Sequence, residues 1–321
     1  MVKVLPKENL SVFLAELSRS YAVFAPVKRD ELTRFDRYSA GDHPTLDYST
    51  TNMPPKSLFL PHGECLVSFG GAGPSVPAAD EKFVIFMNEI DAEAISILDE
   101  IFGGKFQDNY YRRMRENSVI VAVKNGVRMR NSFSDELGLK FRDGFDVLLS
   151  DVGDRYVAEA RTAKGRKLLK SKFIVNGRAS SKAASKTKAK KFDLKKISAF
   201  LDKGPEQKIW HELEKECFAC GICAYVCPVC HCFDVEDAVR LDGGGCRTRY
   251  WDSCMLADFA LVAGGANFRG KRHERIHNWY HHKFARAVAE RGRPDCVGCG
   301  RCITFCPAKI KIHDRILECR K

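Results

Sequence analysis

The chain has 321 residues, 45% of them hydrophobic, which is enough for two domains that each bury a core. Its 53 lysines and arginines against 41 aspartates and glutamates give a formal net charge of +12. The 14 cysteines would suit a secreted disulfide scaffold, but such proteins are short and carry a signal peptide, and residues 1–24 contain charges and no continuous apolar stretch. With no apolar run long enough to cross a membrane, we expect a soluble, cytoplasmic protein in a reducing compartment.

The N-terminal part of the chain alternates between strand and helix patterns. Apolar residues at helical spacing predict a helix over residues 8–19, and Tyr21 to Val27 is typical of a strand closed by Pro26. A loop-rich stretch follows at residues 30–56. Later elements are predicted at residues 83–87 (strand), 91–102 (helix), 118–123, 147–150 and 155–158 (strands). This order predicts a small α/β domain over residues 1–176.

Three features of this part have plain interpretations. The glycine-rich stretch 68–77 lacks the Gly-Lys-Ser/Thr of a phosphate-binding P-loop, so an ordinary loop is favoured. We interpret Cys65 as a core residue. Residues 177–191 are small, polar and basic, and no aromatic residues are interleaved for stacking on bases, so they predict a flexible linker or exposed loop rather than a nucleic-acid contact.

From residue 192 the pattern becomes helical. Helices are predicted around residues 194–201 and 207–216, and a long basic helix over residues 272–291. The sequence therefore predicts an α+β protein, in which the α/β domain is followed by a mostly helical domain at residues 192–321.

A cysteine motif occurs twice in the second domain. It reads Cys217-Phe-Ala-Cys-Gly-Ile-Cys-Ala-Tyr-Val-Cys-Pro228 and Cys296-Val-Gly-Cys-Gly-Arg-Cys-Ile-Thr-Phe-Cys-Pro307. Both copies have the spacing C-x2-C-x2-C-x3-C-P of a bacterial-type ferredoxin with two [4Fe–4S] clusters. Zinc sites pair C-x2-C units and need no third cysteine at that interval, and the C-x3-C-x2-C of radical-SAM clusters is absent.

In this type of motif the fourth cysteine ligates the other cluster. We therefore predict two clusters with exchanged ligands: the first held by Cys217, Cys220, Cys223 and Cys306, the second by Cys296, Cys299, Cys302 and Cys227. Gly221 and Gly300 occupy matching positions, where the backbone passes close to the cluster. Tyr225 and Phe305 also match and are expected to pack over the clusters.

The two motifs are separated by an insertion, residues 228–295, where ordinary ferredoxins have a short hairpin. It contains four further cysteines, of which Cys246 has no assigned role. We interpret Cys230, Cys232 and Cys254 as buried packing residues near the clusters, with a further metal site or a redox thiol as the alternative.

The insertion also contains His273-Glu-Arg-Ile-His277, which fits the H-E-x-x-H signature of zinc proteases. Lys271, Arg272 and Arg275 place cations in and beside this motif, which opposes binding of Zn²⁺. The sequence instead favours a solvated, basic helix face that docks a partner.

The chain resembles the iron–sulfur β subunit of soluble sulfhydrogenases and the A subunit of anaerobic sulfite reductase, almost from end to end. Besides the two cysteine motifs, the resemblance includes Leu5-Pro-Lys-Glu-Asn9, Tyr21 with Ala25-Pro-Val-Lys28, Met53-Pro-Pro-Lys56, Cys227-Pro-Val-Cys-His-Cys232, Trp251-Asp-Ser-Cys254 and Gly264-Gly-Ala-Asn-Phe-Arg269.

The resemblance implies a subunit that relays electrons through two [4Fe–4S] clusters and has no catalytic residues of its own. Its expected partners are a flavin subunit that handles NAD(P)H and a catalytic subunit of the hydrogenase, sulfite reductase or heterodisulfide-reductase type. Family members often hold a third cluster in the N-terminal domain. The corresponding stretches, residues 89–92 and 123–133, lack cysteine, so we expect that this cluster is lost and that the domain is a docking scaffold.

The net charge of +12 leaves a second hypothesis. Two oxidised clusters with their thiolates carry about −2 each and would offset roughly a third of this charge. The remainder is consistent with an acidic protein partner or with a nucleic acid. The alternative function is therefore a basic nucleic-acid-binding or sensory protein with structural clusters.

Overall fold

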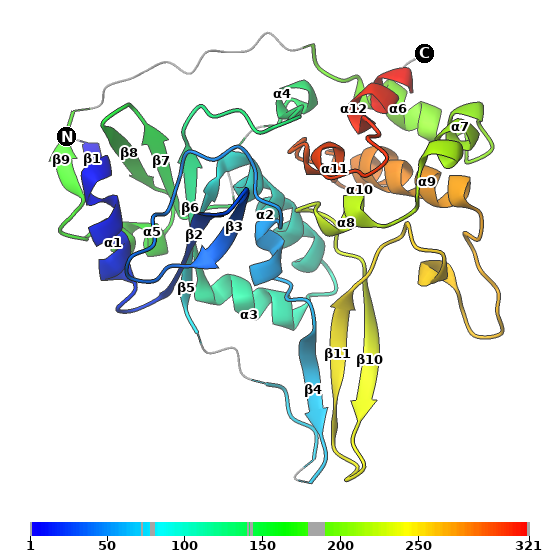
Figure 1. Ribbon diagram of the computed structural model, residues 1–321, viewed down its shortest axis with the longest axis horizontal. Helices are drawn as coiled ribbons and strands as arrows, with labels where there is room; N and C mark the ends of the chain where they lie inside the picture. Colours follow the sequence, from blue (N-terminus) through cyan, green and yellow to red (C-terminus); the bar gives the residue numbers. More distant parts are fainter. Residues whose placement is uncertain are drawn as a thin grey trace. The chain divides into compact units, whose positions relative to one another are not determined.

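The computed structural model describes residues 2–71, 73–77, 81–139, 141, 144–178 and 190–319, and the chain forms two compact units (Figure 1). The first comprises Met1–Phe59, Ala78–Arg130 and Lys140–Lys188, and the second Leu60–Pro77, Asn131–Leu139 and Ala189–Lys321. The segments 60–77 and 131–139 of the predicted domain 1–176 thus belong to the second unit. Most of the predicted linker 177–191 lies outside the described residues.

The first unit is built on a mixed sheet of eight strands in the order β3-β2-β5-β6-β7-β8-β1-β9. The strands are β1 (Val2–Pro6), β2 (Ala22–Arg29), β3 (Leu32–Arg37), β5 (Phe83–Asn88), β6 (Ser118–Lys124), β7 (Val147–Asp151), β8 (Arg155–Ala160) and β9 (Val175–Gly177). Strands β2, β5, β6 and β7 pair in parallel, and the outer pairs are antiparallel. Every residue of β5 is buried, as its continuous apolar run requires of a central parallel strand.

The helices of this unit are α1 (Leu10–Leu17), α2 (Glu89–Phe102), α3 (Asn109–Asn117) and α5 (Ala163–Leu168), with short 3-10 turns at Lys7–Asn9 and Pro55–Leu58. Asn88 caps the N-terminus of α2, and its side chain accepts a hydrogen bond of 2.8 Å from the N–H of Asp91. In the core, the ring of Phe13 in α1 meets the ring of Phe86 in β5 edge-on.

Most of the elements predicted for this unit are present, and some elements were not predicted. The predicted helices near residues 8–19 and 91–102 and the predicted strands are present. The expectation that Pro26 ends its strand is wrong, because β2 continues to Arg29. Its pairing with β5 stops at Phe24, so Pro26 lies where β2 pairs with β3 alone. The loop-rich stretch 30–56 contains β3, and α3 was not predicted.

The second unit combines helices with a small antiparallel sheet, so the description "mostly helical" covers only part of it. Its helices are α4 (Ser134–Leu137), α6 (Leu194–Leu201), α7 (Lys208–Glu216), α8 (Ile222–Tyr225), α9 (Arg272–His281), α10 (Ala287–Arg291), α11 (Arg301–Thr304) and α12 (Ile312–Glu318), with a 3-10 turn at Asp258–Ala260. The predicted helices at residues 194–201 and 207–216 are confirmed as α6 and α7. The long helix predicted at residues 272–291 is interrupted by a π-helical turn, His282–Arg286.

The small sheet has the order β10-β11-β4 and extends away from the helices of its unit (Figure 1). Strands β10 (Phe233–Val239) and β11 (Gly245–Trp251) come from the insertion, and β4 is Glu64–Phe69. A disulfide joins Cys65 of β4 to Cys246 of β11. The interpretation of Cys65 as a core residue is therefore wrong: its partner strand lies 181 residues away in sequence, and no local pattern reveals such a pairing.

Within the described ranges, no helix has both the length and the apolar character needed to span a bilayer.

Candidate iron–sulfur centres

The two cysteine motifs fold with the same backbone. Ala219 and Gly298, each two residues after the first cysteine, have φ angles of 53° and 64°. Gly221 and Gly300 have φ angles of 77° and 78° and precede α8 and α11. These left-handed residues turn the chain where three cysteines of each motif line one cavity, and only glycine adopts this conformation without strain.

Each turn also aims a backbone donor at the first sulfur of its motif. The N–H of Ala219 donates to Sγ of Cys217 over 3.4 Å, and the N–H of Gly298 donates to Sγ of Cys296 over 3.3 Å. Hydrogen bonds to ligand sulfurs are among the factors that set the potential of an iron–sulfur cluster. The two motifs therefore share this backbone donor to the first sulfur.

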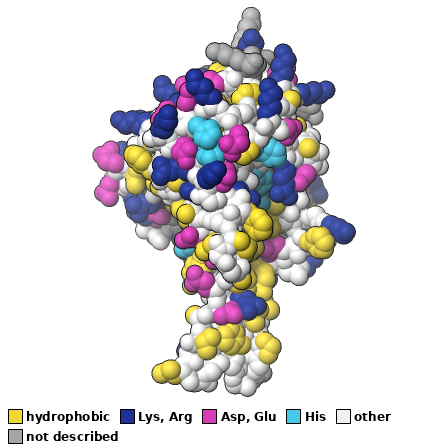
Figure 2. All heavy atoms as spheres, turned by 90° about the vertical axis from the view of Figure 1, so that its right-hand side faces the viewer, with side chains coloured by type: hydrophobic (Ala, Val, Ile, Leu, Met, Phe, Trp, Pro, Cys, Tyr) yellow, Lys and Arg dark blue, Asp and Glu magenta, His cyan; other side chains and the backbone are white. Residues whose placement is uncertain are grey.

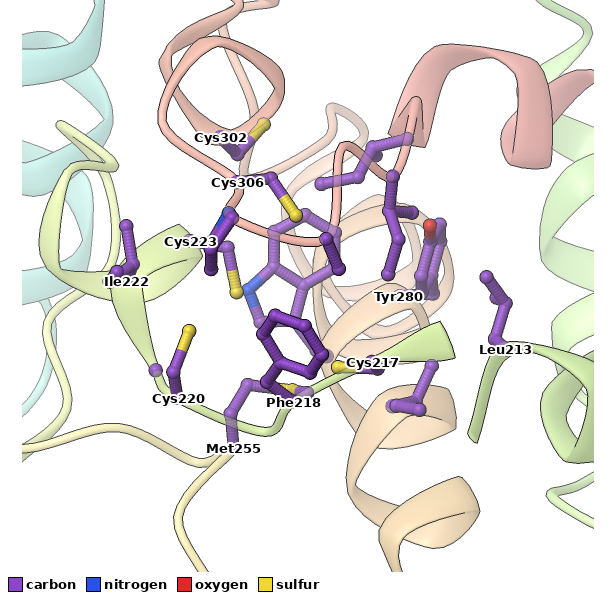
Figure 3. Close-up of a pocket in the computed structure, with 17 residues that line it drawn as sticks. Leu213, Cys217, Phe218, Cys220, Ile222, Cys223, Met255, Tyr280, Cys302 and Cys306 are labelled. Atoms are coloured by element: carbon purple, nitrogen blue, oxygen red, sulfur yellow. The ribbon is translucent and has the colours of Figure 1, made fainter. Parts of the chain in front are cut away.

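The first motif opens onto a cavity (Figure 3). Its lining includes all four cysteines of the first predicted quartet, Cys217, Cys220, Cys223 and Cys306, and also Cys302 of the second. Figure 3 shows their sulfurs directed toward the cavity, whereas the sulfur of Cys302 points away from it. The cavity thus collects three cysteines of the first motif and the fourth cysteine of the second.

The other predicted quartet lines a second cavity. Cys296, Cys299 and Cys302 contribute to it together with Cys227, the fourth cysteine of the first motif. In both cavities, three cysteines of one motif lie with the fourth cysteine of the other. Which cysteines ligate which cluster stays a prediction.

The thiols in these cavities suit a cationic occupant. Burial is the main cause that raises the pKa of Cys223 and of Cys296 to about 12, and it raises the pKa of Cys302 well above its usual value. Four neighbouring thiolates would repel one another at neutral pH. Iron ions remove this obstacle because a coordinating metal deprotonates its thiol ligands. The donor set and the cavities therefore fit [4Fe–4S] clusters.

Lys283 lies against the second quartet and was not anticipated from the sequence. It is 4% exposed, and its Nζ donates to Sγ of Cys227 over 3.3 Å and to the carbonyl oxygen of Asp295 over 2.9 Å. Burial lowers the pKa of Lys283, but the charges of Cys227, Cys230 and Cys296 outweigh burial and hold it well above its usual value. The lysine is therefore a buried cation beside the second centre.

The aromatic walls of the cavities also differ from expectation. Phe218 and Tyr280 line the first cavity, and Trp279 lines both. The residues expected to pack over the clusters, Tyr225 and Phe305, are not in either lining. A motif comparison could not identify Trp279 or Tyr280, because they lie on α9 in the insertion.

Three of the four additional cysteines of the insertion gather at a third cavity. Cys230, Cys232 and Cys254 line it with His231 and His282. A hydrogen bond with Cys232, followed by burial, raises the pKa of the Cys254 thiol. Burial lowers the pKa of His282 to about 4, so this imidazole is neutral at physiological pH. Of the three cysteines only Cys254 is buried, so the packing interpretation does not extend to the half-buried Cys230 and Cys232.

The H-E-x-x-H motif does not form a protease-like zinc site. Nε2 of His277 donates to the carbonyl oxygen of Leu201 over 2.8 Å, which leaves no lone pair on that nitrogen, while His273 contacts Glu206 and Glu214. The expectation of a solvated basic face is also wrong. Arg275 is buried and donates to backbone carbonyls, and Trp279 and Tyr280 pack in the core of the unit.

All cysteines of the chain lie in segments of the second unit. The stretches in which we expected the loss of a third cluster, residues 89–92 and 123–133, lie at the start of α2 and in and after β6. The ligands for clusters therefore come from one unit.

Two comparisons with known proteins agree with this site. Residues 216–310 match the family described as "4Fe-4S dicluster domain". The chain is also 30% identical over 326 residues to sulfhydrogenase 2 subunit beta of Pyrococcus furiosus, an alignment that covers 98% of this chain and 96% of that protein.

Proposed function

We propose an electron-transfer function for this chain, which belongs to the family of sulfhydrogenase β subunits. Two bound [4Fe–4S] clusters would supply a pair of one-electron centres. The protein holds these centres, sets their potentials and brings them close to each other and to a partner. It contributes no catalytic residue of its own.

The observation that carries this proposal is the contact between the two cavities. Cys302 and Trp279 line both of them, so the two quartets are separated by little more than a shared wall. A pair of centres this close suits rapid one-electron transfer. Purely structural clusters would need neither this proximity nor the buried cation Lys283 beside one of them.

The two sites differ in exposure. Cys220 of the first quartet is exposed, and Phe218, at the same cavity, is 65% exposed. Cys227 and Cys299 of the second quartet are buried. We therefore assign the first site to exchange with a partner subunit and the second to the interior of the relay.

We further propose that the partners are a flavin subunit that handles NAD(P)H and a catalytic subunit of the hydrogenase, sulfite reductase or heterodisulfide-reductase type. The printed name of the relative, a subunit of a sulfhydrogenase, supports a multi-subunit assembly. The N-terminal unit, which lacks cysteine, would serve in docking.

The test uses protein isolated without oxygen. We expect about eight iron and eight sulfide per chain, complete reduction by dithionite, and reoxidation by a viologen dye. Copurification from the source organism should recover a flavoprotein and a second metalloprotein. Fewer than eight iron would contradict the two-cluster proposal. Intact clusters that exchange no electrons, with tight, salt-dependent binding of DNA or RNA, would support the alternative of a nucleic-acid-binding protein.

A further inference from the structure

Two histidines and two glutamates form a cluster between α7 and α9, and none of them lines a cysteine cavity. Glu206 precedes α7, His211 and Glu214 belong to α7, and His273 lies in the first turn of α9. On the face shown in Figure 2, histidine side chains are bordered by acidic ones. The sequence hid this arrangement, because only His273 belongs to a recognisable motif.

The spacing of these groups suits a metal ion. Nε2 of His273 is 3.4 Å from one oxygen of Glu206, and Nε2 of His211 is 3.5 Å from the other. One ligand atom from each residue falls within 4.8 Å of the other two. Ligands about 2.1 Å from a tetrahedral ion are ~3.4 Å apart. The side chains therefore need only small rotations to coordinate one ion.

Glu214 lies near Nδ1, the other ring nitrogen, of both His211 and His273. One of its oxygens is 3.3 Å from Nδ1 of His273 and 3.6 Å from Nδ1 of His211. A carboxylate that accepts N–H from Nδ1 leaves the lone pair on Nε2, as second carboxylates do for metal-bound histidines. Both Nε2 lone pairs then face Glu206, an arrangement that is repulsive unless a proton or a metal cation lies between the imidazoles and the carboxylate.

We propose that Glu206, His211 and His273 bind one divalent first-row transition metal ion, and that Glu214 is the positioning residue for the two imidazoles. Imidazole and carboxylate donors suit zinc, iron and nickel. His273 is 3% exposed and forms the rigid wall of the site, whereas the half-exposed His211 and exposed Glu206 leave further coordination positions to water. The ion would join α7, which leads into Cys217, to α9.

The test titrates ZnCl2 into the intact protein, with its clusters, after anaerobic dialysis against a chelator. We expect one saturable equivalent by calorimetry, and zinc X-ray absorption with nitrogen and oxygen neighbours at about 2.0–2.2 Å. Glu206→Gln and His211→Gln should each weaken binding at least about 100-fold, and Glu214→Gln about 10–100-fold. The control is the variant His281→Gln, which should bind zinc like the wild type. His281 is partly exposed and pairs with Asp202 rather than with the proposed ligands.

Three results would overturn the site. One is the absence of a saturable equivalent, which would leave only an ion-paired surface cluster. Another is a zinc environment dominated by sulfur at about 2.3 Å, which would place the ion at cysteines. The last is equal affinity in the wild type, Glu206→Gln and His211→Gln, with iron content and circular dichroism showing that these variants remain folded.

Discussion

Lys283→Met should lower the reduction potential of the second cluster. The lysine is buried, so methionine preserves most of its volume while removing one positive charge. Reduction adds an electron to the cluster, and a nearby cation stabilises the reduced state more than the oxidised state. Loss of the cation therefore makes the potential more negative.

The structure sets the size of the effect. With an effective dielectric constant of about 20, a unit charge 3.3 Å from Sγ of Cys227 contributes ~5 kcal/mol. The added electron is spread over the whole cluster, whose centre lies further from Nζ, so about half of this energy is expected. For a one-electron couple, where a tenfold change in the equilibrium constant is about 59 mV, this corresponds to a shift of ~100 mV.

The assay is a redox titration followed by electron paramagnetic resonance, with iron and sulfide measured on the same samples. The matched control is Lys208→Met, whose side chain is 90% exposed and ion-paired only to Glu212 among its described contacts. It should leave both potentials unchanged. If Lys283→Met retains both clusters and neither potential falls by more than about 30 mV, the assignment of Lys283 as a charge-compensating cation is wrong.

Three further predictions follow from the same geometry. Cys306→Ser should reduce iron from about eight to about four per chain by loss of the first cluster, whereas Cys227→Ser should remove the second; the opposite pattern by electron paramagnetic resonance would refute the exchange of ligands. Ala219→Gly should raise the free energy of unfolding by about 1 kcal/mol, because φ is 53° there, while Ala224→Gly in α8 should lower it; thermal denaturation compares the two. The pair Cys65→Ser and Cys246→Ser should lower the melting temperature with iron content unchanged. Loop-closure entropy for a separation of 181 residues sets a ceiling of ~5 kcal/mol, and an unchanged melting temperature would show that the disulfide does not stabilise the fold.

The sequence predicted what depends on near neighbours. The spacing of Cys217, Cys220 and Cys223 determines a loop, and that loop recurs at the second motif with the same left-handed residues. Helix α2 and strand β5 were predictable from their apolar residues, because the residues that each element buries are close together in the sequence.

What depends on distant partners was not predictable. Cys65 was interpreted as a core residue because its partner, Cys246, belongs to a strand that pairs only in the folded chain. Because of charged residues such as Arg275, α9 was predicted to be solvated. In the structure Arg275 is buried, because the backbone carbonyls of Met255 and Gly270 accept its hydrogen bonds. A charge is interpreted as exposed until the groups that satisfy it are known.

The insertion between the motifs is part of the redox site rather than an appendage to it. In a minimal ferredoxin the two motifs must enclose both clusters by themselves. Here Trp279 lines all three cysteine cavities, Tyr280 lines the first, and Lys283 donates to a sulfur of the second quartet. These residues fall on α9 and the π-helical turn, both within residues 228–295. Burial and nearby charge control cluster potentials. The insertion that interrupts the ferredoxin pattern would therefore also adjust the potentials of the bound clusters.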